Sequence, residues 1–155
     1  MALERGKQRH MSNIWVLVAD TTRARVFTAE TPKGALVEAF DMVNPEARLH
    51  ERDLTSDLSG RSQSSATGMT SSYGGEEKHK PEAVRRFARQ ISERLEHDRG
   101  KGEFDKLYVV AERSFLGELR QVLDDNTAAT LGGTVNKNLT RTPLADIRAA
   151  LPDLL

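Results

Sequence analysis

Two acidic residues follow two apolar runs, and their positions would allow a pair of carboxylates to bind a metal ion. Asp20 comes after the run Ile14–Ala19, and Glu112 comes after Leu107–Ala111. If these runs form neighbouring parallel strands, both acids lie at the carboxyl edge of the sheet, where ligands of such sheets bind. A magnesium ion there would support phosphodiester cleavage. This chemistry needs a third acid, and the candidate Asp41 lies at the end of an outer strand, too far from the other two. The alternative is a local structural role for both residues. Asp20 would form hydrogen bonds within its own turn, and Glu112 would interact favourably with the dipole at the start of the next helix.

Basic residues gather before and within a predicted helix that begins at Pro81. The candidate nucleic-acid-binding residues are Arg61, Lys78, His79, Lys80, Arg85, Arg86 and Arg89. Arg85 and Arg89 share one face of the helix, with Arg86 beside them, and the positive end of the helix dipole adds to their attraction for phosphate. A solvated helix face is the alternative, because the acids Glu76, Glu77, Glu82 and Glu93 dilute this charge.

Other kinds of active site have little support in the sequence. There is no cysteine, and the histidines His50, His79 and His97 show no metal-ligand spacing. The serines Ser62, Ser64 and Ser65 have no identified base, so a serine triad is not expected. We therefore expect no metal and no cofactor.

Composition limits the overall class. The 155 residues are enough for one domain, and 23 basic residues balance 23 acidic ones, so no global field draws the chain to nucleic acid or to a membrane. The longest apolar run is too short to span a bilayer and no signal-peptide pattern precedes it. We expect a cytoplasmic protein with no membrane partner, a disordered leader over residues 1–13 and one α/β domain over residues 14–155.

The order of predicted elements is strand, strand, strand, helix, strand, helix, strand, helix. The strands are expected at Ile14–Ala19, Ala24–Ala29, Leu36–Phe40, Leu107–Ala111 and, weakly, Thr134–Asn138. Short connections make the first three an antiparallel meander, and the later two join by right-handed crossovers parallel to the first. This predicts a mixed five-stranded sheet of order 3-2-1-4-5, the ribonuclease-H-like arrangement, with helices packed on it.

Three helices are expected from apolar spacing and terminal signals. The first begins at Pro81, places Val84, Phe87, Ile91 and Leu95 on one face, and is stopped by Gly100 and Gly102. The second is capped by Ser114 and carries Leu116, Leu119 and Leu123. The third is capped by Thr142-Pro143 and turns Leu144, Ile147 and Leu151 inward.

A long loop after the third strand separates the two halves of the sequence. From Asp53 to Gly75, fourteen of twenty-three residues are Ser, Thr or Gly, and such loops are usually functional or disordered. This composition cannot bury enough apolar area to offset the cost of ordering, so Leu58–Gly75 is expected to be the most mobile internal segment. Residues 55–77 are a candidate surface for a protein partner.

Several short segments, in order over Ile14–Leu155, resemble the bacterial proteins named host attachment proteins. The similar segments are Trp15–Asp20, Arg23–Phe27, Ser59–Ser62, Ala83–Leu95, Phe115–Arg120, Asn138–Thr140 and Pro143-Leu144. That family in turn resembles the middle domain of class-1 translation release factors, which implies the same mixed sheet. Where release factors carry Gly-Gly-Gln, this chain has Gly74-Gly75-Glu76, and a carboxylate there would repel the phosphates of a transfer RNA end. Peptidyl-ester hydrolysis is therefore not expected.

The sequence thus favours a non-enzymatic module that contacts RNA or the ribosome and acts indirectly in attachment to host cells. A metal-dependent phosphodiesterase at Asp20 and Glu112 is one alternative, and a protein-interaction module is another. The oligomeric state does not follow from the sequence.

Overall fold

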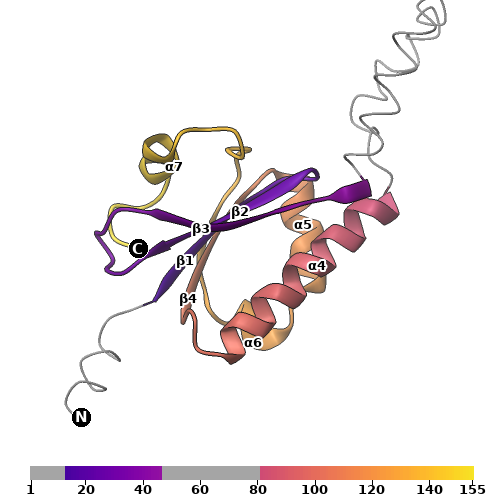
Figure 1. The fold of residues 1–155 in the computed structure, drawn as a ribbon, viewed down its shortest axis with the longest axis horizontal. Helices are drawn as coiled ribbons and strands as arrows, with labels where there is room; N and C mark the ends of the chain where they lie inside the picture. Colours follow the sequence, from indigo (N-terminus) through magenta and orange to yellow (C-terminus); the bar gives the residue numbers. More distant parts are fainter. Residues whose placement is uncertain (1–12, 47–80) are drawn as a thin grey trace, which may run out of the picture.

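The computed structural model describes residues 13–46 and 81–155. The predictions about the leader, the loop Leu58–Gly75 and the Gly74-Gly75-Glu76 tripeptide lie outside the described residues, apart from Asn13. The described residues form one mixed sheet with helices on both faces (Figure 1).

The sheet has five strands in the order β3-β2-β1-β4-β5, which confirms the predicted order. The strands are β1 (Ile14–Ala19), β2 (Arg23–Ala29), β3 (Val37–Val43), β4 (Lys106–Ala111) and β5 (Leu131–Val135). Strands β1, β2 and β3 pair antiparallel, whereas β4 lies parallel to β1 and β5 parallel to β4. This is compatible with a ribonuclease-H-like arrangement.

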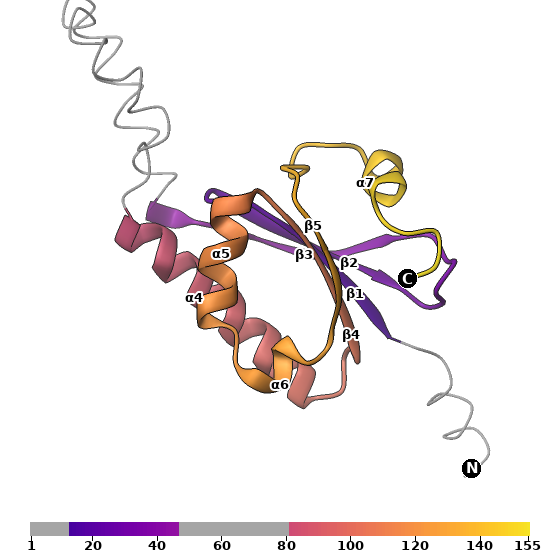
Figure 2. The same ribbon diagram turned by 180° about the vertical axis from the view of Figure 1, so that it is seen from behind.

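Helices cover the two faces of the sheet unequally. Helices α4 (Pro81–Gly100), α5 (Arg113–Val122) and α6 (Asp125–Ala128) lie on one face, and α7 (Leu144–Ala150) lies on the other (Figures 1 and 2). No helix within the described ranges is long and apolar enough to cross a bilayer.

Strand β1 divides the hydrophobic core into two layers, as its unbroken apolar sequence predicts. Trp15, Leu17 and Ala19 pack in the cluster that includes the buried face of α4, while Ile14, Val16 and Val18 belong to the cluster that includes Ile147 of α7. Every residue of β1 is buried, which is the pattern of a central strand covered on both faces.

Helix α4 begins at Pro81 and ends at Gly100, as predicted. Its apolar face buries Phe87, Ile91 and Leu95, whereas Val84 is half-buried. The chain leaves the helix through a Schellman motif: Glu103 N–H donates to the Asp98 carbonyl and Gly102 N–H to the Arg99 carbonyl, both at 2.9 Å. Gly102 has φ 78°, so Gly102 makes the turn and Gly100 is the last helical residue.

Strand β5 begins three residues earlier than predicted and contains two glycines. A Cβ on Gly132 would lie 3.0 Å from Cζ of Tyr108, and one on Gly133 would lie 3.4 Å from Cε2 of the same ring. The glycines let the β5 backbone approach the buried Tyr108 side chain of β4, a tertiary contact that outweighs their low strand propensity.

Three helix predictions were wrong in detail. Glu112 is the N-cap of α5 and Ser114 lies within its first turn, while the short helix α6 was not anticipated. Leu123 is the C-cap of α5 and is only half-buried. In the last helix Ile147 and Leu151 are buried as expected, but Leu144 is 39% exposed. Ile147 and Leu151 belong to the core cluster on this face of the sheet, and Leu144 does not.

Candidate nucleic-acid interface

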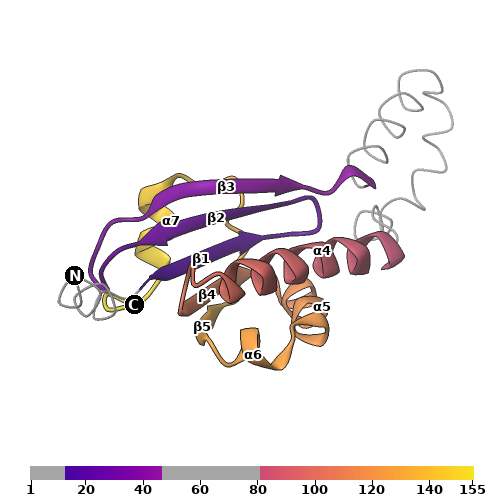
Figure 3. The same cartoon turned by 60° about the horizontal axis from the view of Figure 1, so that its bottom comes forward.

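The carboxyl edge of the parallel strands brings together the ends of several elements. The β1–β2 turn, the end of β3 and the start of α5 lie at this edge, and the start of α4 lies next to the end of β3 (Figure 3). Asn44, which is 1% exposed, joins two of these: its side-chain amide donates to the Thr21 carbonyl at 2.9 Å, and its backbone N–H donates to the Thr22 carbonyl at 2.8 Å. These two hydrogen bonds therefore fix Asn44, the residue that follows β3, against the β1–β2 turn.

Asp20 is bound to its own turn, as the local interpretation predicts. Its Oδ1 accepts hydrogen bonds from Thr22 N at 2.8 Å, Thr22 Oγ1 at 2.7 Å and Arg23 N at 2.9 Å. Its Oδ2 accepts one from Thr140 Oγ1 at 2.7 Å. Burial alone would raise the pKa of Asp20, but the hydrogen bonds from Thr140, Thr22 and Arg23 outweigh it and hold the pKa below its usual value.

Glu112 comes directly after Ala111, which pairs with Ala19, so Asp20 and Glu112 do follow paired positions on parallel strands. Glu112 is exposed, and its Oε1 accepts a hydrogen bond from Ser114 Oγ at 2.7 Å. Asp41 on β3 forms an ion pair with Arg23 on β2, with Oδ2 3.7 Å from Nη2. Within the described residues, no three acids or histidines converge in a way that would hold a metal ion.

Three predicted phosphate-binding residues are exposed on the first turns of α4, but two of them have acidic neighbours. Arg86 forms a two-point ion pair with Glu46, with Nε to Oε2 at 2.7 Å and Nη2 to Oε1 at 2.6 Å. Arg85 Nε lies 3.8 Å from Oε1 of Glu118 on α5. Arg89 makes no hydrogen bond or ion pair with any other described residue.

The ion pair of Arg86 with Glu46 adds an acid to those that are expected from the sequence to dilute the charge of this helix. Glu46 lies 40 positions away, just before the undescribed segment 47–80, and so this ion pair links the two chain ends that flank the segment. Arg61, Lys78, His79 and Lys80 lie outside the described residues, and their role stays a prediction.

The structure also contains a feature that sequence reasoning missed. At the opposite end of the sheet, a pocket of about 510 Å³ opens between the start of β1 and the last turns of α4. Its lining includes Trp15, Phe40 and Arg94, from β1, β3 and α4. The spacing of Arg94 and Asp98 on one helix face was visible in the sequence, but the approach of Phe40 depends on the tertiary fold.

Comparison with known proteins supports both the fold and the family. One similar solved structure is described as "Archaeal protein"; it shares 14% sequence identity and superposes with a TM-score of 0.50. The match covers 88% of this chain but only 33% of the other, so the chain spans about a third of that protein, and the likeness concerns the fold alone. No match was found among curated protein sequences.

A family model provides the more specific evidence. The model described as "Protein required for attachment to host cells" matches residues 15–151, from the start of β1 to the end of α7. The match covers all five strands apart from Ile14, both helical layers, and the start of α4 with Arg85, Arg86 and Arg89. This chain therefore belongs to the host attachment protein family.

Proposed function

We propose that this protein is a non-enzymatic, cytoplasmic member of the host attachment family that binds RNA or the ribosome and acts indirectly in attachment. The observation that carries the proposal is the set of three exposed arginines, Arg85, Arg86 and Arg89, on the first half of α4. The positive end of the helix dipole lies on the same side, so the arginine and backbone contributions to phosphate attraction add.

The acidic partners of these arginines do not remove this surface. The side chains of Arg86 and Glu46 are 52% and 44% exposed. An ion pair in water contributes little net stability, because Coulomb attraction is screened and two long side chains must be ordered. A phosphate can therefore replace Glu46 as the partner of Arg86, while Arg89 has no partner among the described residues. The planar guanidinium suits two-point binding of a phosphate as well as of a carboxylate.

A binding role also agrees with the state of the acidic residues at this edge. Both oxygens of Asp20 accept hydrogen bonds from the fold, and three of the four bonds come from its own turn. Placing a metal ion on this carboxylate would require some of these bonds to break. The arrangement thus favours a structural role for Asp20 over metal-dependent phosphodiester cleavage.

The experiment is an RNA-binding titration by fluorescence anisotropy, with a labelled ribosomal RNA fragment and a labelled single strand, over a range of salt concentrations. The wild type should bind both probes, with an affinity that falls steeply as salt rises because bound counterions are released. Substitution of Arg85, Arg86 and Arg89 by Gln should weaken binding. It should also reduce the slope of log affinity against log salt concentration by about 0.7–0.9 for each lost phosphate contact. The fold should persist because Phe87, Ile91 and Leu95 carry the packing of α4.

A matched control removes the same charge elsewhere. The exposed residues Lys33, Lys137 and Arg141 lie in the β2–β3 and β5–α7 connections, and their triple substitution by Gln also lowers the net charge by three. Equal loss of affinity in both triple variants would show a general charge effect and contradict a specific interface. Absence of salt-sensitive RNA binding by the wild type would contradict the proposal itself and favour a protein partner.

A further inference from the structure

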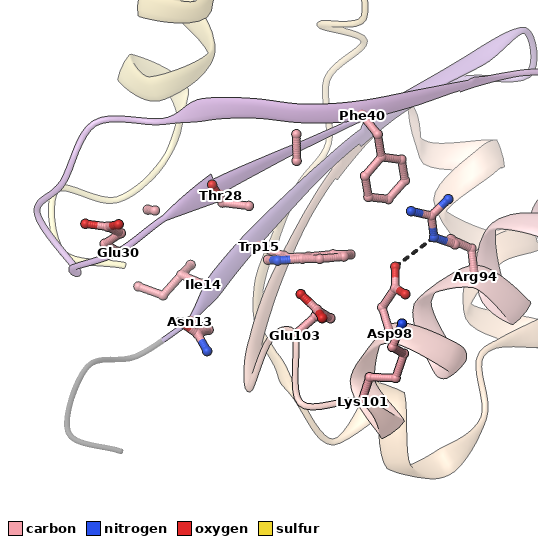
Figure 4. A pocket seen from close by; sticks show the side chains of 12 residues that line it. Asn13, Ile14, Trp15, Thr28, Glu30, Phe40, Arg94, Asp98, Lys101 and Glu103 are labelled. Atoms are coloured by element: carbon pink, nitrogen blue, oxygen red, sulfur yellow. Dashed lines mark hydrogen bonds and ion pairs between the residues drawn. The ribbon is translucent and has the colours of Figure 1, made fainter. Parts of the chain in front are cut away.

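We propose that the pocket at the end of the sheet opposite Asp20 binds a small zwitterion of the α-amino-acid class (Figure 4). Its volume of about 510 Å³ lies within the range of about 300–1,000 Å³ that is typical of small-molecule sites. The pocket is formed by the start of β1, the end of β2, the middle of β3 and the last turns of α4. It is separate from Arg85, Arg86 and Arg89 at the start of α4, so the inference does not depend on RNA binding.

Two aromatic side chains supply the apolar part of the pocket. The rings of Trp15 and Phe40 meet edge to face with centroids 5.6 Å apart, and Phe104 packs against Trp15 at 4.8 Å. Trp15 is only 6% exposed, so its position is fixed by the core. Its indole N–H has no acceptor among the described residues, and it is available to a ligand oxygen.

A cationic wall comes from the end of α4. Arg94 Nε donates to Asp98 Oδ2 at 2.7 Å, and the guanidinium lies 3.8 Å from the centroid of the Phe40 ring. These two contacts hold the guanidinium in place, while its two terminal nitrogens bond to no described residue (Figure 4). Lys101, also unpaired among the described residues, adds a second cation to the lining. This wall is suited to a ligand carboxylate.

Two carboxylates complete the lining from other elements. Glu30 follows the end of β2 and Glu103 follows α4, and both are exposed without an ion-pair partner among the described residues. The charge of Asp98 is already matched by Arg94. Among the described lining residues, this leaves the two carboxylates Glu30 and Glu103 and one cation, Lys101. An anion would meet this excess of carboxylates, whereas a zwitterion can place its ammonium against them and its carboxylate against α4. Its side chain would then contact Trp15 and Phe40.

The single tryptophan of the chain makes the test direct. Trp15 is the only one in the sequence, so fluorescence excited selectively at tryptophan, and not at Tyr73 or Tyr108, reports on this pocket. The probes are L-leucine, L-methionine and L-phenylalanine, each titrated to about 10 mM, where a millimolar dissociation constant is readily measured. We expect a saturable fluorescence change. L-Leucinamide lacks the carboxylate and N-acetyl-L-leucine lacks the ammonium, and both should bind at least about tenfold more weakly than L-leucine.

Two conservative substitutions test the charged walls. Glu103→Gln and Arg94→Lys should each weaken the binding of the best amino acid by about tenfold. The first removes the negative charge offered to the ligand ammonium, and the second keeps the positive charge but removes the forked guanidinium donors offered to the ligand carboxylate. Glu82→Gln and Arg141→Lys make the same chemical changes at exposed positions outside the pocket and should leave affinity unchanged. If Arg94→Lys perturbs the fold, the paired change Arg94→Gln with Asp98→Asn avoids a buried unpaired carboxylate and should show the same loss.

Two outcomes would overturn the inference. No fluorescence change with any of the three amino acids would show that the pocket does not take this class of ligand. Binding of L-leucinamide or N-acetyl-L-leucine as tight as that of L-leucine would show that the ligand is not recognised as a zwitterion.

Discussion

Thr140 and Asp20 are 120 positions apart in the sequence and are joined by a hydrogen bond of 2.7 Å. Thr140 is 1% exposed, and its carbonyl accepts a further bond from Arg25 Nη1 at 3.1 Å. The segment before α7 is therefore attached to both sides of the β1–β2 turn. This attachment holds the last part of the chain against the central strands and fixes the turn at the carboxyl edge.

Replacing Thr140 by Val should destabilise the protein by about 1.5–3 kcal/mol, the usual contribution of a hydrogen bond to a charged group. The substitution keeps the shape of the side chain and removes the hydroxyl that donates to Asp20 Oδ2 at 2.7 Å and, more weakly, to Asn138 Oδ1 at 3.0 Å. Thr142→Val is the control, because the side chain of Thr142 has no described hydrogen bond. Chemical unfolding of both variants measures the difference, and equal stabilities would show that the Asp20 bond contributes nothing.

The same bonds predict a pH dependence of stability. The folded-state pKa of Asp20 is lowered, so its ionised form is favoured by folding. The resulting stabilisation is present above the unfolded pKa of about 3.9 and is lost as pH falls through the lower folded value. The stability difference between the wild type and Asp20→Asn should therefore be largest above about pH 5 and should shrink in stronger acid. Unfolding at several pH values tests this, and a difference that is constant with pH would contradict it.

Two glycines at the end of α4 should respond in opposite ways to substitution by alanine. Gly102 has φ 78°, so Gly102→Ala should cost about 1–2 kcal/mol through the left-handed backbone alone, as no atom lies near the added Cβ. Gly100 is helical and equally open, so Gly100→Ala should stabilise by about 0.5–1 kcal/mol. Thermal unfolding of the two variants gives the comparison, and melting temperatures that change in the same direction would contradict the Schellman assignment.

The strand order could be predicted from the sequence because its signals are local. Continuous apolar runs such as Ile14–Ala19 identify strands buried on both faces, and the lengths of the connections decide whether neighbouring strands are parallel. The apolar stripe of α4 and the stop at Gly102 are equally local. By contrast, local signals predict a start of β5 that is too late, because Gly132 and Gly133 owe their strand conformation to Tyr108 on the neighbouring strand.

The side-chain partners at the candidate interface could not be predicted in the same way. Arg86 was assigned to phosphate from its helix position, but its acidic partner Glu46 comes from the other end of a long undescribed segment. The pocket at Trp15 was missed for the same reason, since Phe40 and Arg94 meet only when β3 and α4 pack on the sheet. Local spacing identifies charged faces, whereas their partners depend on contacts between distant segments.

The ion pair of Arg86 and Glu46 gives the last prediction. If phosphate competes with Glu46 for Arg86, Glu46→Gln should tighten RNA binding and increase its salt dependence, because the arginine no longer has a carboxylate partner. Glu96→Gln is the matched control: it removes one exposed carboxylate from the far half of α4, where no described arginine pairs with it. Anisotropy titrations at low and moderate salt should show tighter binding for Glu46→Gln than for Glu96→Gln. If both variants bind RNA equally, Arg86 does not take part in phosphate contact, and the interface must depend on other basic residues.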